Sequence, residues 1–195
     1  MAPSEEFVSN DTVKEKLIIA GISELERHGI ADFSLRRVAS SCNVSCAAPY
    51  KHFPGKEDFI REIVGYIHNQ WIMLQSQVMS VFENDTGKQL TEMCVAYIRF
   101  WIGNRNFRAV LMMNTDTIVS GESNTKQHMS QCIRELSAKY CMEKGAAEDV
   151  QEELAFCINA LVYGAALMTD SNMLSGNEDT INMLRKSIEK ELNRI

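Results

Sequence analysis

Apolar residues recur along the chain at intervals of three and four positions, the spacing of amphipathic helices. The first stripe follows a capping-box pattern, Thr12-Val-Lys-Glu15, and ends at Gly29. It consists of Val13, Leu17, Ala20, Gly21 and Leu25. The chain contains only three prolines and none after Pro54, so the later helices are not interrupted. Because alternating runs of β-branched residues are also scarce, the sequence predicts an all-α fold.

A short second helix and a tight turn are predicted after Gly29. Ser34 is a good N-cap, because its hydroxyl can accept a hydrogen bond from the backbone of the first turn. The stripe that this helix is expected to bury consists of Leu35, Val38, Ala39 and Cys42. Asn43 follows where such a turn needs a left-handed residue, a conformation that asparagine tolerates well. A third helix is expected to open at Ser45 or Cys46.

Proline and glycine limit the third helix and separate it from a long fourth one. Pro49 has to lie in the first turn of the third helix, where its missing N–H costs little, so that helix is short and ends near Phe53. Pro54 and Gly55 then break the chain, and Lys56 opens the fourth helix. The inner stripe of the fourth helix is predicted to consist of Phe59, Ile63, Ile67 and Trp71.

The rest of the chain is predicted to form further helices. We expect helices at residues 90–101, 127–144, 148–174 and 178–195, and a polar loop at residues 114–126. The predicted stripe of the longest of them consists of Val150, Leu154, Cys157, Leu161, Gly164, Ala165 and Met168. We therefore predict a three-helix helix-turn-helix domain at residues 1–55 and a larger helical domain at residues 56–195.

The charge pattern sets the predicted helix-turn-helix apart from the rest of the chain. The formal net charge is −6, yet the segment from Ser34 to Lys56 contains no acidic residue. Its charged residues are Arg36, Arg37, Lys51 and Lys56. A local basic patch is enough to bind phosphate, whatever the net charge of the whole protein. This segment is therefore a candidate surface for nucleic acid.

Several other classes of protein are disfavoured. The N-terminus is acidic and has no apolar core, so we expect no signal peptide, and no apolar stretch reaches the roughly 20 residues of a membrane span. The six cysteines form no Cys-x-x-Cys pair, which indicates reduced thiols in a cytoplasmic protein. A glycine-rich phosphate loop, a His-Glu-x-x-His motif and a Gly-x-Ser-x-Gly elbow are missing, so we expect no enzyme, no metal and no cofactor.

The residues of the predicted third helix suit entry into the major groove of DNA. Cys46, Ala47 and Ala48 are small, so the backbone can approach base edges, and alanine can contact a thymine methyl group. The groups that can reach phosphates are Tyr50, Lys51, His52 and Lys56. The alternative interpretation is an ordinary helical hairpin with a solvated charged face.

The segment SLRRVASSCNVSCAAPYKHFPGKEDF, which begins at Ser34, closely resembles the DNA-binding domain of the tetracycline-repressor (TetR) family. The core of the match consists of Val44-Ser45, Tyr50-x-His52-Phe53 and Lys56-Glu57, within a resemblance over about residues 10–65. The resemblance implies contacts to bases or the adjacent backbone from Arg36, Cys46, Ala47 and Tyr50. It implies contacts to phosphates from Ser34, Ala48, His52 and Lys56.

The chain departs from the family pattern at three positions of this motif. Asn43 replaces the usual glycine, and Ala48 and Pro49 replace the common threonine and leucine. The predicted recognition helix therefore carries few hydrogen-bonding groups. We expect base readout to rest on Arg36 and on the shape of the DNA.

The resemblance also implies a homodimer, a palindromic double-stranded DNA operator and a small-molecule inducer. The last two helices, at residues 148–174 and 178–195, are expected to form a four-helix bundle with those of a second copy. The middle helices are expected to hold the inducer. Candidate lining residues are Trp71, Tyr97, Trp101, Met112, Met113, Met129, Phe156, Asn159 and Tyr163. Methionine and aromatic side chains suit an adaptable apolar cavity, although each of them can equally be core packing.

Together these patterns predict a cytoplasmic, DNA-binding transcriptional regulator, a repressor that a small ligand releases from DNA. The alternative is a DNA-bound interaction protein that is regulated by a protein partner or by thiol oxidation. Cys42 and Cys46 flank the predicted turn, where oxidation of a thiol would perturb DNA binding. A buried Cys42 and an incidental Cys46 are the simpler interpretation.

Overall fold

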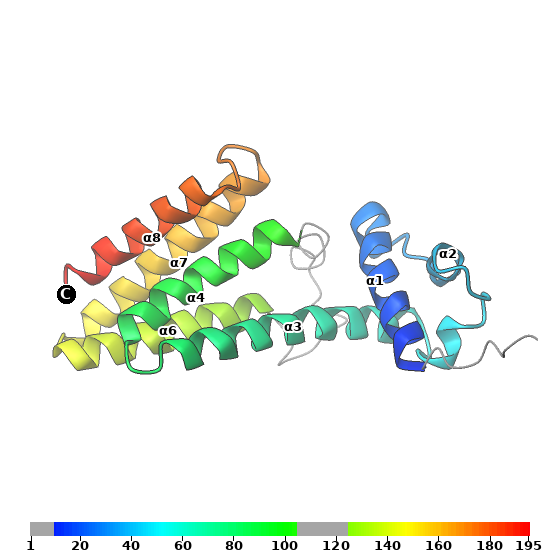
Figure 1. The fold of residues 1–195 in the computed structure, drawn as a ribbon, viewed down its shortest axis with the longest axis horizontal. Coiled ribbons are helices and arrows are strands. Elements are labelled where there is room, and N and C mark those ends of the chain that lie inside the picture. Colours follow the sequence, from blue (N-terminus) through cyan, green and yellow to red (C-terminus); the bar gives the residue numbers. More distant parts are fainter. Residues whose placement is uncertain (1–9, 105–124) are drawn as a thin grey trace, which may run out of the picture. The chain divides into compact units, whose positions relative to one another are not determined.

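The computed structural model describes residues 10–104 and 125–195. These residues form helices and no strand, which confirms the predicted all-α fold (Figure 1). The elements are α1 (Asn10–His28), α2 (Leu35–Ser41), the 3-10 helix η1 (Pro49–Lys51), α3 (Lys56–Val81), α4 (Thr86–Gly103), α6 (Thr125–Lys144), α7 (Glu148–Asp170) and α8 (Glu178–Leu192).

The described residues divide into two compact units. We call residues 10–67 unit 1 and residues 68–104 together with 125–195 unit 2. The division lies within α3, after Ile67, whereas the sequence predicts a domain boundary at the start of that helix. The first part of α3 therefore belongs to the core of unit 1, and its second part belongs to the core of unit 2.

In unit 1, α1 and α3 approach each other closely at Gly21. A Cβ atom at this position would lie 2.3 Å from Phe59 Cε1 and 2.7 Å from Ile63 Cδ1, so the approach depends on the missing side chain. Phe59, Ile63 and Ile67 are fully buried, as their predicted stripe requires. These contacts give α2 and the segment after it a rigid base.

The ends of α1 and α2 follow local sequence signals. α1 begins at Asn10, so the prediction of a start at Thr12 is wrong; asparagine and aspartate at this end are themselves favoured there. The predicted stop at Gly29 is confirmed, with φ +69°. Ser34 caps α2, since its Oγ accepts a hydrogen bond from Arg37 N at 3.4 Å. In the predicted stripe of α2, Leu35, Val38 and Ala39 are buried, whereas Cys42 is only half-buried.

The turn after α2 adopts the predicted left-handed conformation, with φ 55° at Asn43. The segment after it, however, is not a regular α-helix. Residues 46–48 form turns, and only Pro49–Lys51 form a short 3-10 helix. Pro49 has no N–H to donate to Ser45 O, and Ala48 N donates to that carbonyl instead at 2.9 Å. The helix-turn-helix is present, but its third element is a 3-10 helix.

In unit 2, α4 packs against α6, α7 and α8, and α8 folds back along α7 (Figure 1). The predicted helix at residues 90–101 is α4, and its whole apolar stripe is buried: Leu90, Met93, Cys94, Tyr97, Ile98 and Trp101. The predicted helix at residues 127–144 is α6, which stops at Gly145 with φ +70°. Of the predicted loop at residues 114–126, all but the last two residues lie outside the described part; those two begin α6.

The buried face of α7 is rotated relative to its predicted stripe. The buried positions are Leu154, Ala155, Ile158, Val162, Ala165, Ala166 and Thr169. Of the predicted stripe only Leu154 and Ala165 are fully buried, and Met168 is 43% exposed. The prediction fails because α7 carries apolar residues on every face, so periodicity alone does not select one. α7 also ends before residue 174, because Asn172 adopts a left-handed φ of 57°.

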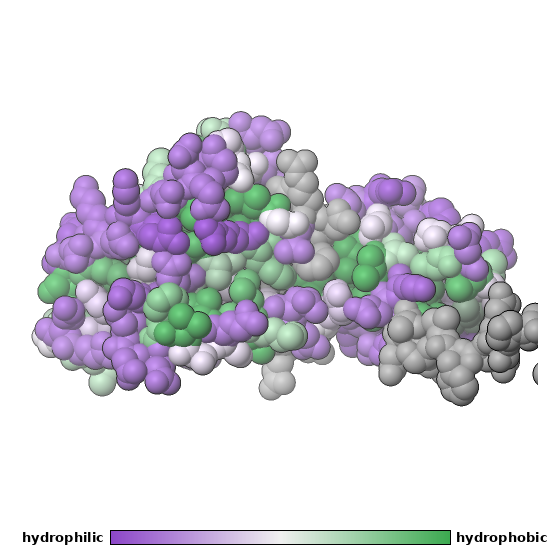
Figure 2. Space-filling view, viewed as in Figure 1, coloured by the Kyte–Doolittle hydropathy of each residue, from purple (hydrophilic) through white to green (hydrophobic). Residues whose placement is uncertain are grey.

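Among the described helices, α7 is the one that is long and apolar enough to cross a membrane by length and composition. A core helix of a globular protein meets the same criterion, and α7 packs against three other helices of unit 2. Figure 2 shows hydrophilic residues over most of the visible face of both units, with smaller apolar areas between them.

Candidate functional site

The residues predicted to contact DNA lie on the outside of unit 1. The exposed ones are Arg36, Cys46, Ala47, Tyr50 and Lys51, and the half-buried ones are Ser34, Ala48, His52 and Lys56. Pro49 and Phe53 point inward between them and are buried. These two residues attach the segment to the core of unit 1, while the side chains around them stay accessible.

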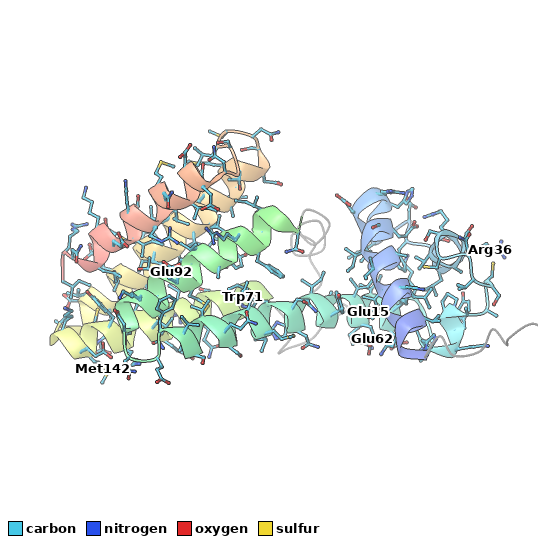
Figure 3. The ribbon with its side chains drawn as sticks, viewed as in Figure 1. Glu15, Arg36, Glu62, Trp71, Glu92 and Met142 are labelled. Atoms are coloured by element: carbon cyan, nitrogen blue, oxygen red, sulfur yellow. The ribbon has the colours of Figure 1, made fainter. Side chains whose placement is uncertain are left out.

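Two adjacent arginines on α2 have different environments. The Arg37 guanidinium donates from Nε to Glu24 Oε1 at 2.7 Å and from Nη2 to the backbone oxygen of Asp32. Arg36 makes no hydrogen bond or ion pair with any described residue, and Figure 3 shows it on the side of α2 that faces away from α1. Arg37 thus links α2 to Glu24 of α1 and to Asp32, whereas Arg36 is available to an external partner.

Glu24 connects α1 to the start of α2, a role that the sequence does not predict. Its carboxylate is 8% exposed and accepts hydrogen bonds from Ser34 N at 3.2 Å and from the Arg37 side chain. The hydrogen bond from Arg37 and the charge of the carboxylate raise the pKa of the Arg37 guanidinium. Since Ser34 and Arg37 form the first turn of α2, Glu24 ties the start of that helix to α1. The one sequence signal that points to Glu24 is its place as a polar residue beside the apolar stripe of α1.

Lys56, a predicted phosphate contact, also has a structural role. Its ammonium group donates to the backbone oxygen of Ala31 at 2.9 Å. An ammonium group has three donors, so this bond leaves two for a phosphate. The next residues, Glu57 and Asp58, are acidic and lie in the first turn of α3. The lysine side chain, rather than the end of the helix, therefore supplies positive charge at this place.

The candidate ligand residues are divided between the core and the surface of unit 2. Trp71 on α3 and Tyr97 and Trp101 on α4 are at most 3% exposed. Tyr163 and Asn159 on α7 are half-buried. Phe156, in contrast, is 73% exposed and does not belong with them. Met112 and Met113 lie outside the described residues, as does the side chain of Met129.

Tyr97 is the centre of an aromatic cluster. Its ring centroid lies 5.5 Å from that of Trp71 in an edge-on arrangement, 6.1 Å from that of Trp101 and 6.4 Å from that of Tyr163. Figure 3 shows Trp71 between α3 and α4. Phe100 extends the cluster, with its centroid 5.9 Å from that of Trp71. Four of the nine candidate residues are thus brought together, from three helices.

Three polar atoms of this cluster lack partners among the described residues. Trp71 Nε1, Tyr97 Oη and Trp101 Nε1 are buried and make no hydrogen bond there, and on α7 the same holds for Asn159 Oδ1. Such atoms are uncommon in native proteins, where buried tyrosine hydroxyls and indole N–H groups usually find a partner. Burial, with a smaller contribution from Tyr163, raises the pKa of Tyr97 well above its usual range, so its hydroxyl stays a donor at neutral pH.

The cysteines of the described residues are all free. Cys46 is exposed in the segment that is predicted to contact DNA, and Cys42 is half-buried with its thiol 3.5 Å from the backbone oxygen of Lys16. Burial raises the pKa of Cys94 and raises that of Cys132 to about 11, so these thiols are unreactive at neutral pH. Within the described ranges no group of three or more His, Cys, Asp or Glu residues is placed to hold a metal ion.

Comparison with known proteins agrees with this description. Residues 17–63 match the model of the bacterial regulatory proteins of the tetR family. No curated relative matches the sequence. Three solved structures have the same fold at low sequence identity. The first is a protein of unknown function from Rhodococcus sp. RHA1, which is 18% identical and has a TM-score of 0.73, and the match covers 100% of this chain and 99% of that one. The second is a TetR-like transcriptional regulator from the same organism, which is 10% identical and has a TM-score of 0.72, with 97% of this chain and 99% of that one covered. The third is a TetR transcriptional regulator from Legionella pneumophila, which is 19% identical and has a TM-score of 0.65, with 97% of this chain and 98% of that one covered.

The family model covers Glu24, α2, the turn at Asn43 and the residues up to Lys56 that are predicted to contact DNA. The solved structures extend the similarity of fold over nearly the whole chain. Residues 17–63 are therefore similar to the bacterial regulatory proteins of the tetR family, and the fold of the chain is that of solved TetR-like transcriptional regulators.

Proposed function

We propose that this protein is a cytoplasmic transcriptional repressor that binds a palindromic operator as a homodimer and leaves it when a small molecule binds unit 2. The observation that carries the proposal is the surface of residues 34–56. Its side chains are accessible, its charges are all positive, and Arg36 makes no bond within the described residues. We propose no catalytic function.

Recognition of the operator is proposed to combine one direct contact with a close approach of the backbone. Arg36 can donate two hydrogen bonds to a guanine in the major groove, or contact the backbone beside it. Cys46 and Ala47 are small and exposed, so the 3-10 segment can lie against the base edges. Lys51 and Lys56 supply charge for the phosphates on either side.

The homodimer is proposed to form through the outer faces of α7 and α8. Phe156 is 73% exposed, Leu167 52% and Met183 50%, although all three are large apolar side chains. A Cβ added at Gly164 would meet nothing within 4 Å in the single chain, so a second helix could approach closely there. Two copies joined by a two-fold axis would present two copies of the Arg36 surface, which accounts for a palindromic operator.

Thiol oxidation remains the second candidate for regulation, because Cys46 is exposed among the DNA-facing residues. Oxidation of Cys46 would add a polar and bulkier group where a small side chain is needed. The same alternative includes regulation by a protein partner that binds in place of the small ligand. If the Cys46→Ser variant still loses DNA binding under mild oxidant, the thiol of Cys46 is not the switch.

A gel-shift titration against the DNA upstream of the gene for this protein, at several salt concentrations, tests the proposed function. We expect a tight, competitor-resistant complex with a palindromic footprint. Arg36→Ala should cost about 1–3 kcal/mol and relax the sequence preference. Lys56→Ala should lower the salt slope by about one unit without changing that preference. The control is Lys88→Ala, which removes a lysine of unit 2 that pairs with Asp85 at 3.3 Å. Weak binding to every DNA tested, unchanged by Arg36→Ala, would refute the proposal.

The dimer is tested by sedimentation velocity on two matched variants. Leu167→Glu puts a charge on the proposed interface, and we expect it to convert the dimer into a monomer. Met142→Glu changes an even more exposed apolar residue, 72% exposed on α6, and should leave the dimer intact. A wild-type monomer, or a dimer that survives Leu167→Glu, would contradict an interface at this face.

A further inference from the structure

The core of unit 2 contains three aromatic side chains that each keep one unused hydrogen-bond donor. They are the indole N–H groups of Trp71 and Trp101 and the hydroxyl of Tyr97, and their side chains are 0%, 3% and 1% exposed. The rings of the two tryptophans both lie against that of Tyr97. No described residue pairs with these donors, so each of them can bond a molecule that enters the cluster.

We propose that the ligand of this protein is an uncharged, flat aromatic molecule with a hydrogen-bond-accepting oxygen, held against Trp71, Tyr97 and Trp101. The proposal rests on the proposed function, in which a small molecule binds unit 2. It adds the chemical class of that molecule.

The accepting oxygen follows from the excess of donors over acceptors. Three of the unused polar groups can donate, whereas the indole N–H groups cannot accept at all. The unused buried amide acceptors among the described residues, Asn159 Oδ1, Gln75 Oε1 and Gln89 Oε1, belong to side chains outside the aromatic cluster. A ligand with a carbonyl or ether oxygen satisfies the donors of the cluster.

The lack of charge follows from the surroundings of the cluster. Among the described residues of unit 2, no Lys, Arg, Asp or Glu side chain is buried. The charged residues of α4 are all paired at the surface: Lys88 with Asp85, Glu92 with Arg185 and Arg99 with Glu178. A buried carboxylate or ammonium group on the ligand would therefore find no counter-ion among them, which disfavours both.

An aromatic cluster can also bind a quaternary ammonium ion over its ring faces, and this rival needs separate treatment. The edge-on contact between Trp71 and Tyr97, with planes at 89°, already covers a ring face with the edge of another ring. The unused N–H and O–H groups present positive hydrogen atoms, which repel a cation and attract an oxygen. The donors thus favour a neutral acceptor over a cation, and flat rings complement the remaining faces.

Four small probes that share one naphthalene ring test the class of ligand. They are methyl 2-naphthyl ketone, 2-ethylnaphthalene, 2-naphthoate and (2-naphthylmethyl)trimethylammonium. Binding to the full chain without DNA is measured by titration calorimetry, and the site is located by quenching of tryptophan emission. The chain has two tryptophans, Trp71 and Trp101, so any quenching reports on this cluster. We expect the ketone to bind about tenfold more tightly than the hydrocarbon and both charged probes to bind more weakly than the ketone.

Tyr97→Phe identifies the donor. We expect it to reduce the preference for the ketone over the hydrocarbon about fivefold, and to leave the affinity for the hydrocarbon unchanged. The ligand-free variant should melt at the same or a higher temperature than the wild type, because it loses an unpaired hydroxyl; a merely structural tyrosine would melt lower. The control is Tyr140→Phe, which removes a hydroxyl bonded to Leu192 O at 3.2 Å outside the cluster. This variant should keep the full preference for the ketone.

The results that overturn the inference are equally definite. Equal affinities for ketone and hydrocarbon, tightest binding of a charged probe, or no binding of any probe would each do so. The gel shift separates this inference from the proposed function. If the ketone binds by way of Tyr97 but does not change a specific complex with DNA, the class of ligand stands and the release from DNA falls. If no specific DNA complex forms at all, the proposed function fails while the ranking of the probes still decides the class of ligand.

Discussion

In unit 1 the buried carboxylate of Glu24 accepts hydrogen bonds from a backbone N–H and from a guanidinium, whereas in unit 2 the buried polar atoms of Tyr97 and Trp71 accept and donate none. The difference extends beyond these residues. Every buried side-chain N or O atom without a partner in the described part of the chain lies in unit 2. In unit 1 the buried polar side chains are therefore paired with other groups of the unit, whereas in unit 2 several are not.

This difference fits the two tasks that we propose. A surface that must match the DNA backbone gains from a fixed α2, which Glu24 provides through Ser34 and Arg37. A site that must respond to a ligand gains from groups that are satisfied only when the ligand is bound, because only a difference in affinity between two states can shift their populations. Unused donors at Trp71, Tyr97 and Trp101 provide such a difference.

Among the variants that test this difference between the two units, Glu24→Ala is expected to have the largest effect on stability. It leaves Ser34 N without a partner and removes a charge-assisted hydrogen bond. We expect a loss of about 2–3 kcal/mol in the free energy of unfolding, moderated because solvent can reach the guanidinium. Urea unfolding followed by circular dichroism measures it. The control Glu62→Ala breaks an exposed pair with Lys14 and should cost at most about 1 kcal/mol. Equal losses in the two variants would show that Glu24 does not organise unit 1.

Gly21→Ala tests the rigid base of unit 1. The new Cβ would lie within 3 Å of Phe59 and Ile63, two fully buried side chains that have little room to move. After allowing for the better helix propensity of alanine, we expect a loss of about 1–2 kcal/mol. Gly65→Ala in α3 is the matched control, because nothing lies within 4 Å of its added Cβ. It should be stabilising by about 0.5–1 kcal/mol, and a loss at Gly65 as large as that at Gly21 would contradict the steric explanation.

The sequence predicts unit 1 better than unit 2, because the signals in unit 1 depend on residues that are close together in the sequence. The Ser34 cap, the left-handed Asn43 and the stop at Gly29 depend on neighbouring residues, so a single sequence contains them. The bond between Glu24 and Arg37 joins residues from two helices, and no local pattern specifies it. The prediction of a third α-helix is wrong, because Pro49 cannot donate to Ser45 O and a regular first turn does not form there.

In unit 2 the sequence predicts which helices are apolar but not which side of each helix faces the core. α7 is apolar all round, so its buried face is chosen by α4, α6 and α8 and not by its own periodicity. Trp71, Tyr97 and Trp101 could be proposed as ligand residues by type alone, and Phe156 was proposed on the same grounds although it is exposed. Which donors stay unpaired is a property of the packed core, so only the structure reveals it.

One substitution made in both units should have opposite effects. Ser34→Ala removes the oxygen that accepts from Arg37 N, and we expect a loss of about 1 kcal/mol in stability. Ser137 in α6 is 0% exposed, and its hydroxyl has no partner, so Ser137→Ala should stabilise the protein by up to about 1 kcal/mol. Thermal unfolding of both variants measures the two signs. A loss at Ser137 equal to that at Ser34 would remove the distinction between paired and unpaired buried groups.

The smallest effect concerns alkaline pH. Burial raises the pKa of the hydroxyls of Tyr97 and Tyr163 in the folded protein, so both stay neutral where an unfolded chain loses the protons. Stability from these groups is therefore complete below the unfolded value of about 10 and falls as the pH rises above it. Tyr97→Phe should make the fall in melting temperature above about pH 10 less steep, because the more deeply buried of the two hydroxyls is gone. Tyr50→Phe changes a ring that is 60% exposed on unit 1 and is the matched control. If both variants follow the wild-type curve, Tyr97 is hydrated in solution, and its donor is not held back for a ligand.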